Sequence, residues 1–206
     1  HEECLRSPEE KAFVKTLLDV PSARAARMHR RGISVRSAEE HTSEVPTEGE
    51  VCVPVLLVQY TDVKFSSSDP KGNFEERLNG EHYTDEGGYG SIRQYFMDQS
   101  EGKFRPEFDA IGPVTLSHEM KYYGGNDKEG VDLRPREMVS EACRRAYSEL
   151  NTDFARYDNN GDGYVDIVYV IYAGYGEASY PDKLENTVWP HQWQLETPLT
   201  LGGVKI

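Results

Sequence analysis

The sequence has no apolar stretch of the roughly 20 residues that a membrane-spanning helix requires. It also lacks a secretion signal at its start, because the opening letters HEECLRSPEE are polar and charged. These two absences leave a cytosolic protein or a protein from which a signal has been removed. Since the sequence begins at His1 instead of methionine, we expect removal or trimming.

Cysteine is also scarce. Cys4, Cys52 and Cys143 are widely separated and odd in number, so they form neither a disulfide framework nor a Cys-x-x-Cys metal pair. We interpret Cys52 and Cys143 as core or incidental thiols, in an apolar strand and on a helix. Cys4 alone could be a functional thiol.

Basic residues are outnumbered, with 23 Lys and Arg against 36 Asp and Glu and a formal net charge of -13. Broad binding to nucleic acid or to an anionic membrane surface needs a basic face, so both are disfavoured. The balance is compatible with a soluble protein that binds cations.

The composition changes near residues 46–49. Residues 1–48 contain a short helical pattern, the arginine-rich letters SARAARMHRRGISVR and the polar letters SAEEHTSEVPTEGE, which are typical of a leader or linker. Residues 49–206 are enough to bury a core of their own. We therefore predict one domain over 49–206 with an appended leader over 1–48.

Apolar patterns in the domain predict strands and helices in alternation. Residues 51–63 form a continuous β-branched run that indicates a central strand, and a polar loop follows it. Residues 91–102 predict a helix with Ser91 as N-cap and with Ile92, Tyr95 and Phe96 on one face.

Residues 104–116 indicate an extended pair broken at Gly112-Pro113, and residues 134–150 form a second amphipathic helix. The apolar run over 164–174 predicts a strand covered on both faces. The resulting fold class is α/β (α+β), with a mixed twisted sheet and two packed helices.

The letters YDNNGDGYVD, residues 157–166, resemble the opening of a calcium loop. Side-chain oxygens alternate at Asp158, Asn160 and Asp162, Asp166 follows, and Tyr164 can offer its backbone carbonyl. The twelfth position of a helix–loop–helix site would be a bidentate Glu, but the residue there is Tyr169. We predict a structural calcium site completed by another segment or water; the alternative is an exposed turn rich in Asn and Gly.

Two other motifs contain a histidine that could serve a site. In HEMKY, residues 118–122, Tyr122 stands where the zinc motif H-E-x-x-H needs its second histidine, so we interpret His118 and Glu119 as an exposed pair. In VWPHQWQL, residues 188–195, His191 is a candidate cleft residue. The alternative is that both tryptophans fill a core margin while the histidine bonds to the backbone.

Several stretches in order resemble the immune inhibitor A family of secreted bacterial zinc metallopeptidases. They are VPVLLVQYTDVKF at 53–65, GSIRQYFMDQSEGKFRPEFDAIGPVTL at 90–116, YYGGND at 122–127, FARYDNNGDGYVDIVYVIYAGYGEAS at 154–179 and WPHQW at 189–193. The resemblance implies the upper N-terminal subdomain of a zincin-type catalytic domain, with residues 1–48 as the end of a propeptide. It also implies that the acidic loop is a calcium site bracing the strand beside the cleft.

The resemblance places the zinc helix and its third ligand beyond Ile206, so no catalytic residue can be named in this chain. We expect part of a secreted, calcium-stabilised, zinc-dependent endopeptidase that acts on proteins or peptides but is inactive as this chain alone. Zinc is expected only in the intact enzyme, where Cys4 could mask it as a thiolate or could be an unpaired thiol. An exposed face would favour self-association or marginal stability.

Two readings from other classes compete. One is a non-catalytic, calcium-stabilised module that binds glycan or protein through its Tyr and Trp surface. The other is a calcium sensor, which the single incomplete loop disfavours because sensors use paired sites.

Overall fold

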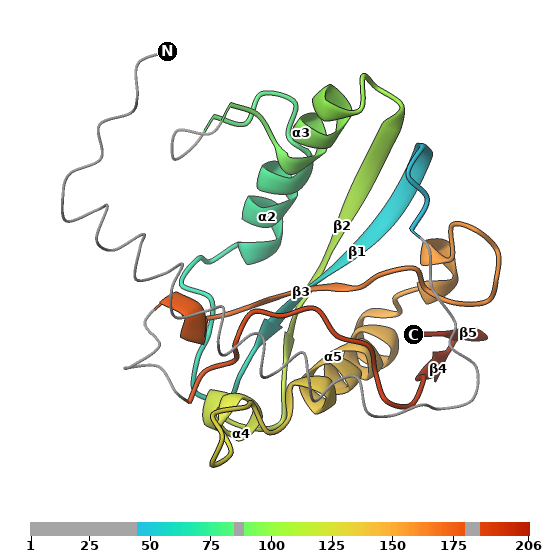
Figure 1. Cartoon of the computed structure of the whole chain (residues 1–206). Helices are drawn as coiled ribbons and strands as arrows, with labels where there is room; N and C mark the ends of the chain where they lie inside the picture. The colour runs from blue at the N-terminus through green and yellow to red at the C-terminus, as the bar shows by residue number, and fades with distance from the viewer. Residues whose placement is uncertain (1–44, 85–88, 180–185) are drawn as a thin grey trace.

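The computed structural model describes residues 45–84, 89–179 and 186–206 (Figure 1). Almost all of the predicted leader, including Cys4, lies outside these residues, so the division at residue 48 stays a prediction. Within the described ranges, no helix is long and apolar enough to cross a membrane.

A three-stranded parallel sheet forms the centre of the fold. Its order is β2-β1-β3, with β1 at Gly49–Gln59, β2 at Phe104–Thr115 and β3 at Tyr169–Tyr172. Alternate side chains of β1 enter two separate apolar clusters, one containing Val53 and Leu57 and the other Leu56 and Val58. Both faces of β1 are therefore covered, which explains its continuous apolar sequence.

Helices cover the two faces of this sheet (Figure 1). On one face lie α2, Pro70–Asn79, and α3, Ile92–Gln99, which contribute Leu78 and Phe96 to the first cluster. On the other lies α5, Pro135–Leu150, whose Ala142, Cys143 and Ala146 are fully buried. The short helix α4, Met120–Gly124, sits beyond the end of β2, and a hairpin of β4, Thr200–Leu201, and β5, Val204–Lys205, closes the chain.

The predicted α/β class is confirmed, and both predicted helices form. The Ser91 hydroxyl accepts the N–H of Gln94 as the expected cap of α3. The apolar face predicted for α3 is only partly confirmed. Phe96 packs against the core, but Ile92 and Tyr95 are 40% and 60% exposed. The main sheet is parallel, where a mixed sheet was expected.

Three local predictions were wrong. Helix α2 lies where we expected a loop: the Asp69 carboxylate accepts the N–H of Gly72 and starts a helix whose sequence has little apolar patterning. The expected pair over 104–116 is a single strand, because ten residues of β1 hold it in register with only one irregularity, between Leu56 and Val58. The expected strand over 164–174 pairs with β1 only at Tyr169–Tyr172, and it is partly exposed because it lies at the sheet edge.

Candidate functional site

The predicted calcium loop follows a short 3-10 helix, Phe154–Tyr157, and winds around one carboxylate. Asp158 accepts backbone N–H groups of Gly161, Asp162 and Gly163 at 2.9, 3.0 and 2.9 Å. Gly161 and Gly163 have φ of 75° and 88°, a conformation that glycine adopts without strain. The alternation of oxygen side chains thus belongs to a tightly turned loop.

Asn159, which is not among the predicted ligands, connects this loop to the central strand β1 by hydrogen bonds. Its side-chain oxygen accepts the N–H of Cys52 at 2.8 Å, and its Nδ2 donates to the carbonyl of Cys52 at 3.1 Å. The same Nδ2 donates to Asp166 Oδ2 at 2.8 Å, and the Asn159 N–H donates to that oxygen at 3.2 Å. One amide therefore pairs with β1 as a neighbouring strand would and also holds the last carboxylate of the loop.

The chemistry of the loop suits a hard cation. Asp166 is 7% exposed, and this burial raises its pKa; the hydrogen bonds from Asn159 lower the pKa, while the charges of Asp162 and Asp158 raise it further. Carboxylate and amide oxygens are the ligands that calcium prefers. Some of these oxygens, however, accept hydrogen bonds within the loop, including the bond from Tyr164 N–H to Asp162 Oδ1. Among the described residues, no three His, Cys, Asp or Glu side chains are grouped so as to hold a metal ion.

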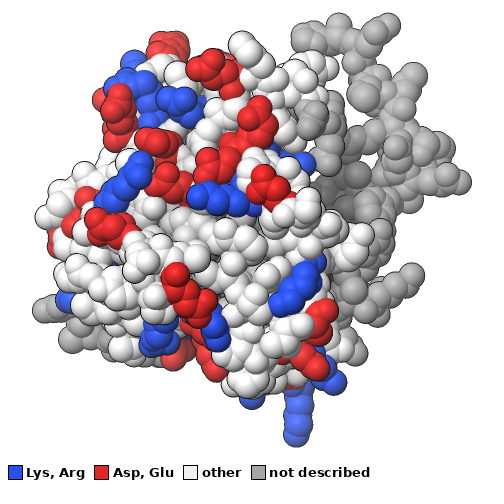
Figure 2. Space-filling model, turned by 180° about the vertical axis from the view of Figure 1, so that it is seen from behind, with Lys and Arg blue, Asp and Glu red and all other residues white. Residues whose placement is uncertain are grey.

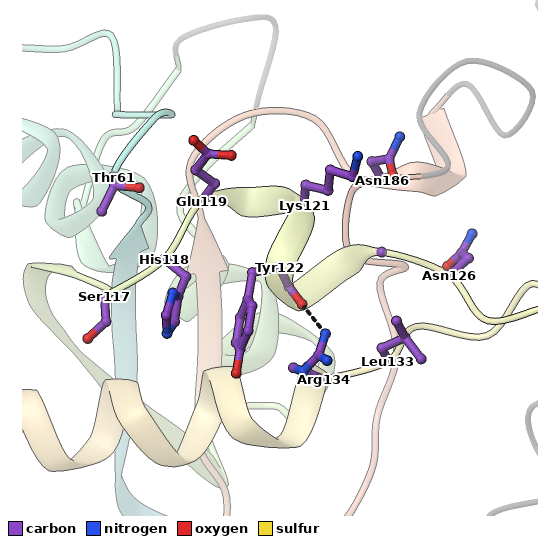
Figure 3. Close-up of a pocket in the computed structure, with 11 residues that line it drawn as sticks. Thr61, Ser117, His118, Glu119, Lys121, Tyr122, Asn126, Leu133, Arg134 and Asn186 are labelled. Atoms are coloured by element: carbon purple, nitrogen blue, oxygen red, sulfur yellow. Dashed lines mark hydrogen bonds between the residues drawn. The ribbon is translucent and has the colours of Figure 1, made fainter.

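A pocket of about 660 Å³ lies beyond the carboxyl ends of β1 and β2 (Figure 3). Thr61 follows β1, Ser117 and His118 follow β2, and the remaining lining residues come from α4, the loops on either side of Leu133 and the segment at Asn186. Crevices at this end of parallel strands are common ligand sites in α/β folds. Most of the residues that line it are polar or charged.

Three planar side chains form a row along the pocket (Figure 3). The ring of His118 stacks on that of Tyr122 with 4.0 Å between centroids, and the guanidinium of Arg134 lies 4.4 Å from the centroid of Tyr122. Arg134 Nη1 also donates to the Tyr122 carbonyl at 3.1 Å. His118 and Glu119 are exposed, as predicted, and α4 is too short to be a zinc helix.

The carboxylate of Glu141, on α5, accepts hydrogen bonds from several segments at this end of the sheet. Its Oε1 accepts the N–H and hydroxyl of Ser117 and the Nε of Arg145, and its Oε2 accepts the hydroxyl of Tyr123 at 2.6 Å. Burial by itself raises the pKa of Glu141, but the bonds from Tyr123, Ser117 and Arg145 outweigh it and lower the pKa to about 2. The ionised carboxylate therefore ties the turn after β2 to α4 and α5.

Polar contacts also anchor the far side of the pocket. Asn126 Nδ2 donates to the fully buried carboxylate of Glu177 at 3.2 Å, and Asp132 accepts the N–H of Trp189 at 2.8 Å. The sequence did offer one signal for Glu177, an acidic residue soon after an apolar strand. Its partner Asn126 is 51 positions away and could not be inferred from spacing.

His191 is exposed as a whole residue, but its ring is partly buried, and its Nδ1 bonds to the carbonyl of Trp189. Partial burial of the ring lowers its pKa, the contact with Trp189 raises it, and the charge of Arg136 lowers it. Trp189 is buried. The guanidinium carbon of Arg136 lies 4.7 Å from the centroid of the Trp193 ring. His191 is not among the residues that line the pocket, and its role in a cleft stays a prediction.

Comparison with known proteins gives one family match and several relatives. Residues 53–205 match the family described as immune inhibitor A peptidase M6, catalytic domain. Immune inhibitor A of Bacillus thuringiensis subsp. alesti is 29% identical over 185 residues, which cover 74% of this chain and 27% of that protein. The pre-pro-metalloprotease PrtV of Vibrio cholerae serotype O1 (strain M66-2) is 27% identical over 167 residues, which cover 73% of this chain and 18% of that protein. The chain therefore spans about a quarter or less of the curated relatives that it matches.

Proposed function

The chain belongs to the immune inhibitor A peptidase M6 family, and we propose that it forms part of the catalytic domain of a secreted, zinc-dependent endopeptidase. The observation that carries the proposal is the family match to a catalytic domain across 153 of its residues, 53–205. Proteins or peptides are the corresponding substrates. Figure 2 shows acidic and basic side chains interspersed on the face that it presents.

This chain by itself would not hydrolyse peptides. Zinc peptidases activate water on a metal held by three protein ligands, commonly with H-E-x-x-H supplying two of them and a glutamate base. The 206 residues contain six histidines and no H-E-x-x-H. The role that fits them is to build the sheet beside the cleft, and the chain should release no product from a fluorogenic peptide mixture with added Zn²⁺. Zinc-dependent cleavage that a chelator abolishes would contradict this.

Calcium is the second part of the proposal. Asp158, Asn160, Asp162 and Asp166, with the Tyr164 carbonyl, supply the oxygen ligands. The ion would offset the mutual repulsion of these carboxylates and stabilise a loop that Asn159 already fastens to β1.

A thermal melt tests the calcium site. A ligand at 100 times its Kd that binds only the folded state stabilises that state by about 2.7 kcal/mol, or roughly 5 to 10 °C for a domain of this size. We expect such a rise with calcium over chelator, and we expect Asp158→Ala/Asp162→Ala to remove it.

The matched control is Glu50→Ala/Glu75→Ala, which also removes two carboxylates, both of them exposed and located on β1 and α2. It should keep the calcium response. Identical melts of the wild type with calcium and with chelator would reduce the loop to an acidic turn and leave the family assignment untouched.

A further inference from the structure

The hairpin of β4 and β5 is a separate two-stranded sheet, and it meets the rest of the fold at the acidic loop (Figure 1). The Lys205 N–H donates to the Gly163 carbonyl at 2.9 Å, and the Val165 N–H donates to the Lys205 carbonyl at 2.8 Å. These two bonds form a parallel bridge between Tyr164 and Lys205. The loop that we propose as a calcium site is therefore also a strand partner of β5.

The geometry of the hairpin directs the backbone of Lys205 toward the loop. Leu199 and Ile206 share two hydrogen bonds across the hairpin, at 3.0 and 2.8 Å, and Thr200 faces Lys205 at the next position. In an antiparallel pair, bonded positions alternate with positions whose N–H and C=O groups point away from the partner strand. One edge of β5 thus pairs with β4, and its other edge pairs with the loop.

The backbone of the loop alternates in the same way. Gly163 and Val165 bond to β5, so the N–H and C=O groups of Tyr164 point to the opposite side. The Tyr164 N–H confirms this direction, because it donates to Asp162 Oδ1 at 2.9 Å. The Tyr164 carbonyl, which is the predicted calcium ligand, shares that direction. An ion bound to it would hold residues 163–165 in the extended form with which β5 pairs.

Without an ion, two properties of the loop work against that extended form. The carboxylates of Asp158, Asp162 and Asp166 repel one another. Gly163 lies directly beside the bridge, and a glycine has more alternative backbone conformations than any other residue. A cation would offset the repulsion and reduce the number of alternatives, which favours the conformation that β5 requires.

From this arrangement we propose that calcium binding at the acidic loop and docking of the β4–β5 hairpin favour each other. The inference rests on the proposed function, because it takes the loop as a calcium site. Val204 is buried in the core and also holds the hairpin, so calcium would strengthen the docking and not create it. The family match extends to residue 205, so the ion would regulate the order of a strand within the catalytic-domain part of the chain.

Amide hydrogen exchange of the whole chain, followed by NMR with calcium at about 100 times its Kd and with chelator, tests this coupling. Calcium at that concentration makes the empty loop about 100-fold rarer. We expect the Lys205 amide to exchange about tenfold more slowly with calcium, which is within the range usual for coupled sites. The Gly72 amide, which bonds to the N-cap Asp69 of α2, should not change. Slower exchange at Gly163 without a change at Lys205 would overturn the proposal.

The coupling must also act in reverse, because the effect of one binding event on another is reciprocal. Lys205→Pro removes the N–H that bonds to Gly163, while the two bonds between Leu199 and Ile206 remain possible. In calorimetric titration it should weaken calcium binding about fivefold to tenfold. Lys205→Ala is the matched control, since it removes the side-chain contact with Tyr164 but keeps the backbone N–H, and it should leave the calcium affinity unchanged. Equal calcium affinities of Lys205→Pro and the wild type would overturn the proposal.

Thermal melts show whether each variant is folded, and the exchange measurement on the wild type needs no variant. If calcium neither binds to the wild type nor raises its melting temperature, the calcium site and the coupling are both wrong. If calcium raises the melting temperature but leaves exchange at Lys205 unchanged, the calcium site is retained and only the coupling is wrong.

Discussion

Replacing Glu141 by Gln should change how the stability of the fold depends on pH. The carboxylate accepts four hydrogen bonds, and its side chain is only 20% exposed. Glutamine keeps the shape and one acceptor but removes the charge, and its NH₂ group would face the Tyr123 hydroxyl or Arg145.

The expected change in unfolding free energy follows from the pKa of Glu141, which is about 2 in the folded chain against an ordinary value of 4.5. Full linkage over that difference corresponds to about 3.4 kcal/mol at 1.36 kcal/mol per pH unit. Arg145 is 29% exposed and Glu149 competes for it, so solvent screening reduces the expected value to about 1 to 2 kcal/mol.

The direction in which stability changes with pH follows from which state of the chain binds the proton. Between pH 4.5 and 2 the unfolded chain binds a proton at this position that the folded chain does not, so the stabilisation is complete above pH 4.5 and is lost as pH falls toward 2. Urea unfolding of the wild type and Glu141→Gln should therefore differ by about 1 to 2 kcal/mol at pH 7, and the difference should shrink steadily below pH 4.5.

Glu149→Gln is the matched control, because Glu149 bonds to the same arginine at 2.7 Å but is 49% exposed. It should cost no more than about 0.5 kcal/mol at any pH. A constant difference between wild type and Glu141→Gln from pH 7 down to pH 3 would refute the reasoning, since it would mean that the introduced NH₂ group, and not the loss of the charge, accounts for the change in stability.

Two further substitutions test the contacts that position the loop and the pocket. Asn159→Leu removes both side-chain bonds to the backbone of β1 and the side-chain donor to Asp166, so it should cost about 2 to 3 kcal/mol in urea unfolding. The side chain of Asn160 bonds only to exposed Asp162, so Asn160→Leu should cost less, and equal losses would contradict the role of Asn159. Gly124→Ala places a Cβ 2.4 Å from the carbonyl carbon of Thr187, and should lower stability by about 1 to 3 kcal/mol; an unchanged melting temperature would show that the two segments are not packed as described.

The sequence predicted best those elements whose apolar pattern has a single physical cause, the burial of particular faces. The apolar run of β1 follows from burial on both faces, and the stripe of α5 follows from one buried face with Cys143 at its centre. Helix α2 was missed because it is mostly polar and contributes one fully buried residue, Leu78, so its formation depends on its cap and on packing against β2.

The polar contacts around the pocket were beyond sequence reasoning for another reason. Glu141 meets Ser117 across 24 positions and Asn126 meets Glu177 across 51, and nothing in local spacing selects these pairs. The row of His118, Tyr122 and Arg134 likewise appears only when α4 folds back beside α5. By contrast, the acidic loop could be found because its oxygen side chains are neighbours in sequence.

The acidic loop and the pocket lie at opposite ends of one strand and do not influence each other electrostatically. Asn159 holds the acidic loop at Cys52, near the start of β1, whereas the pocket begins at Thr61, just past its end. Nine residues of extended chain span about 30 Å, several times the screening length of about 8 Å at physiological ionic strength. The field of an ion at the loop therefore does not reach Arg134, and any influence must pass through the packing of β1. Because β1 is paired on both sides and buried on both faces, it has no second arrangement to switch into. Calcium bound at the loop would thus stabilise the sheet beside the pocket without changing the electrostatics of the pocket.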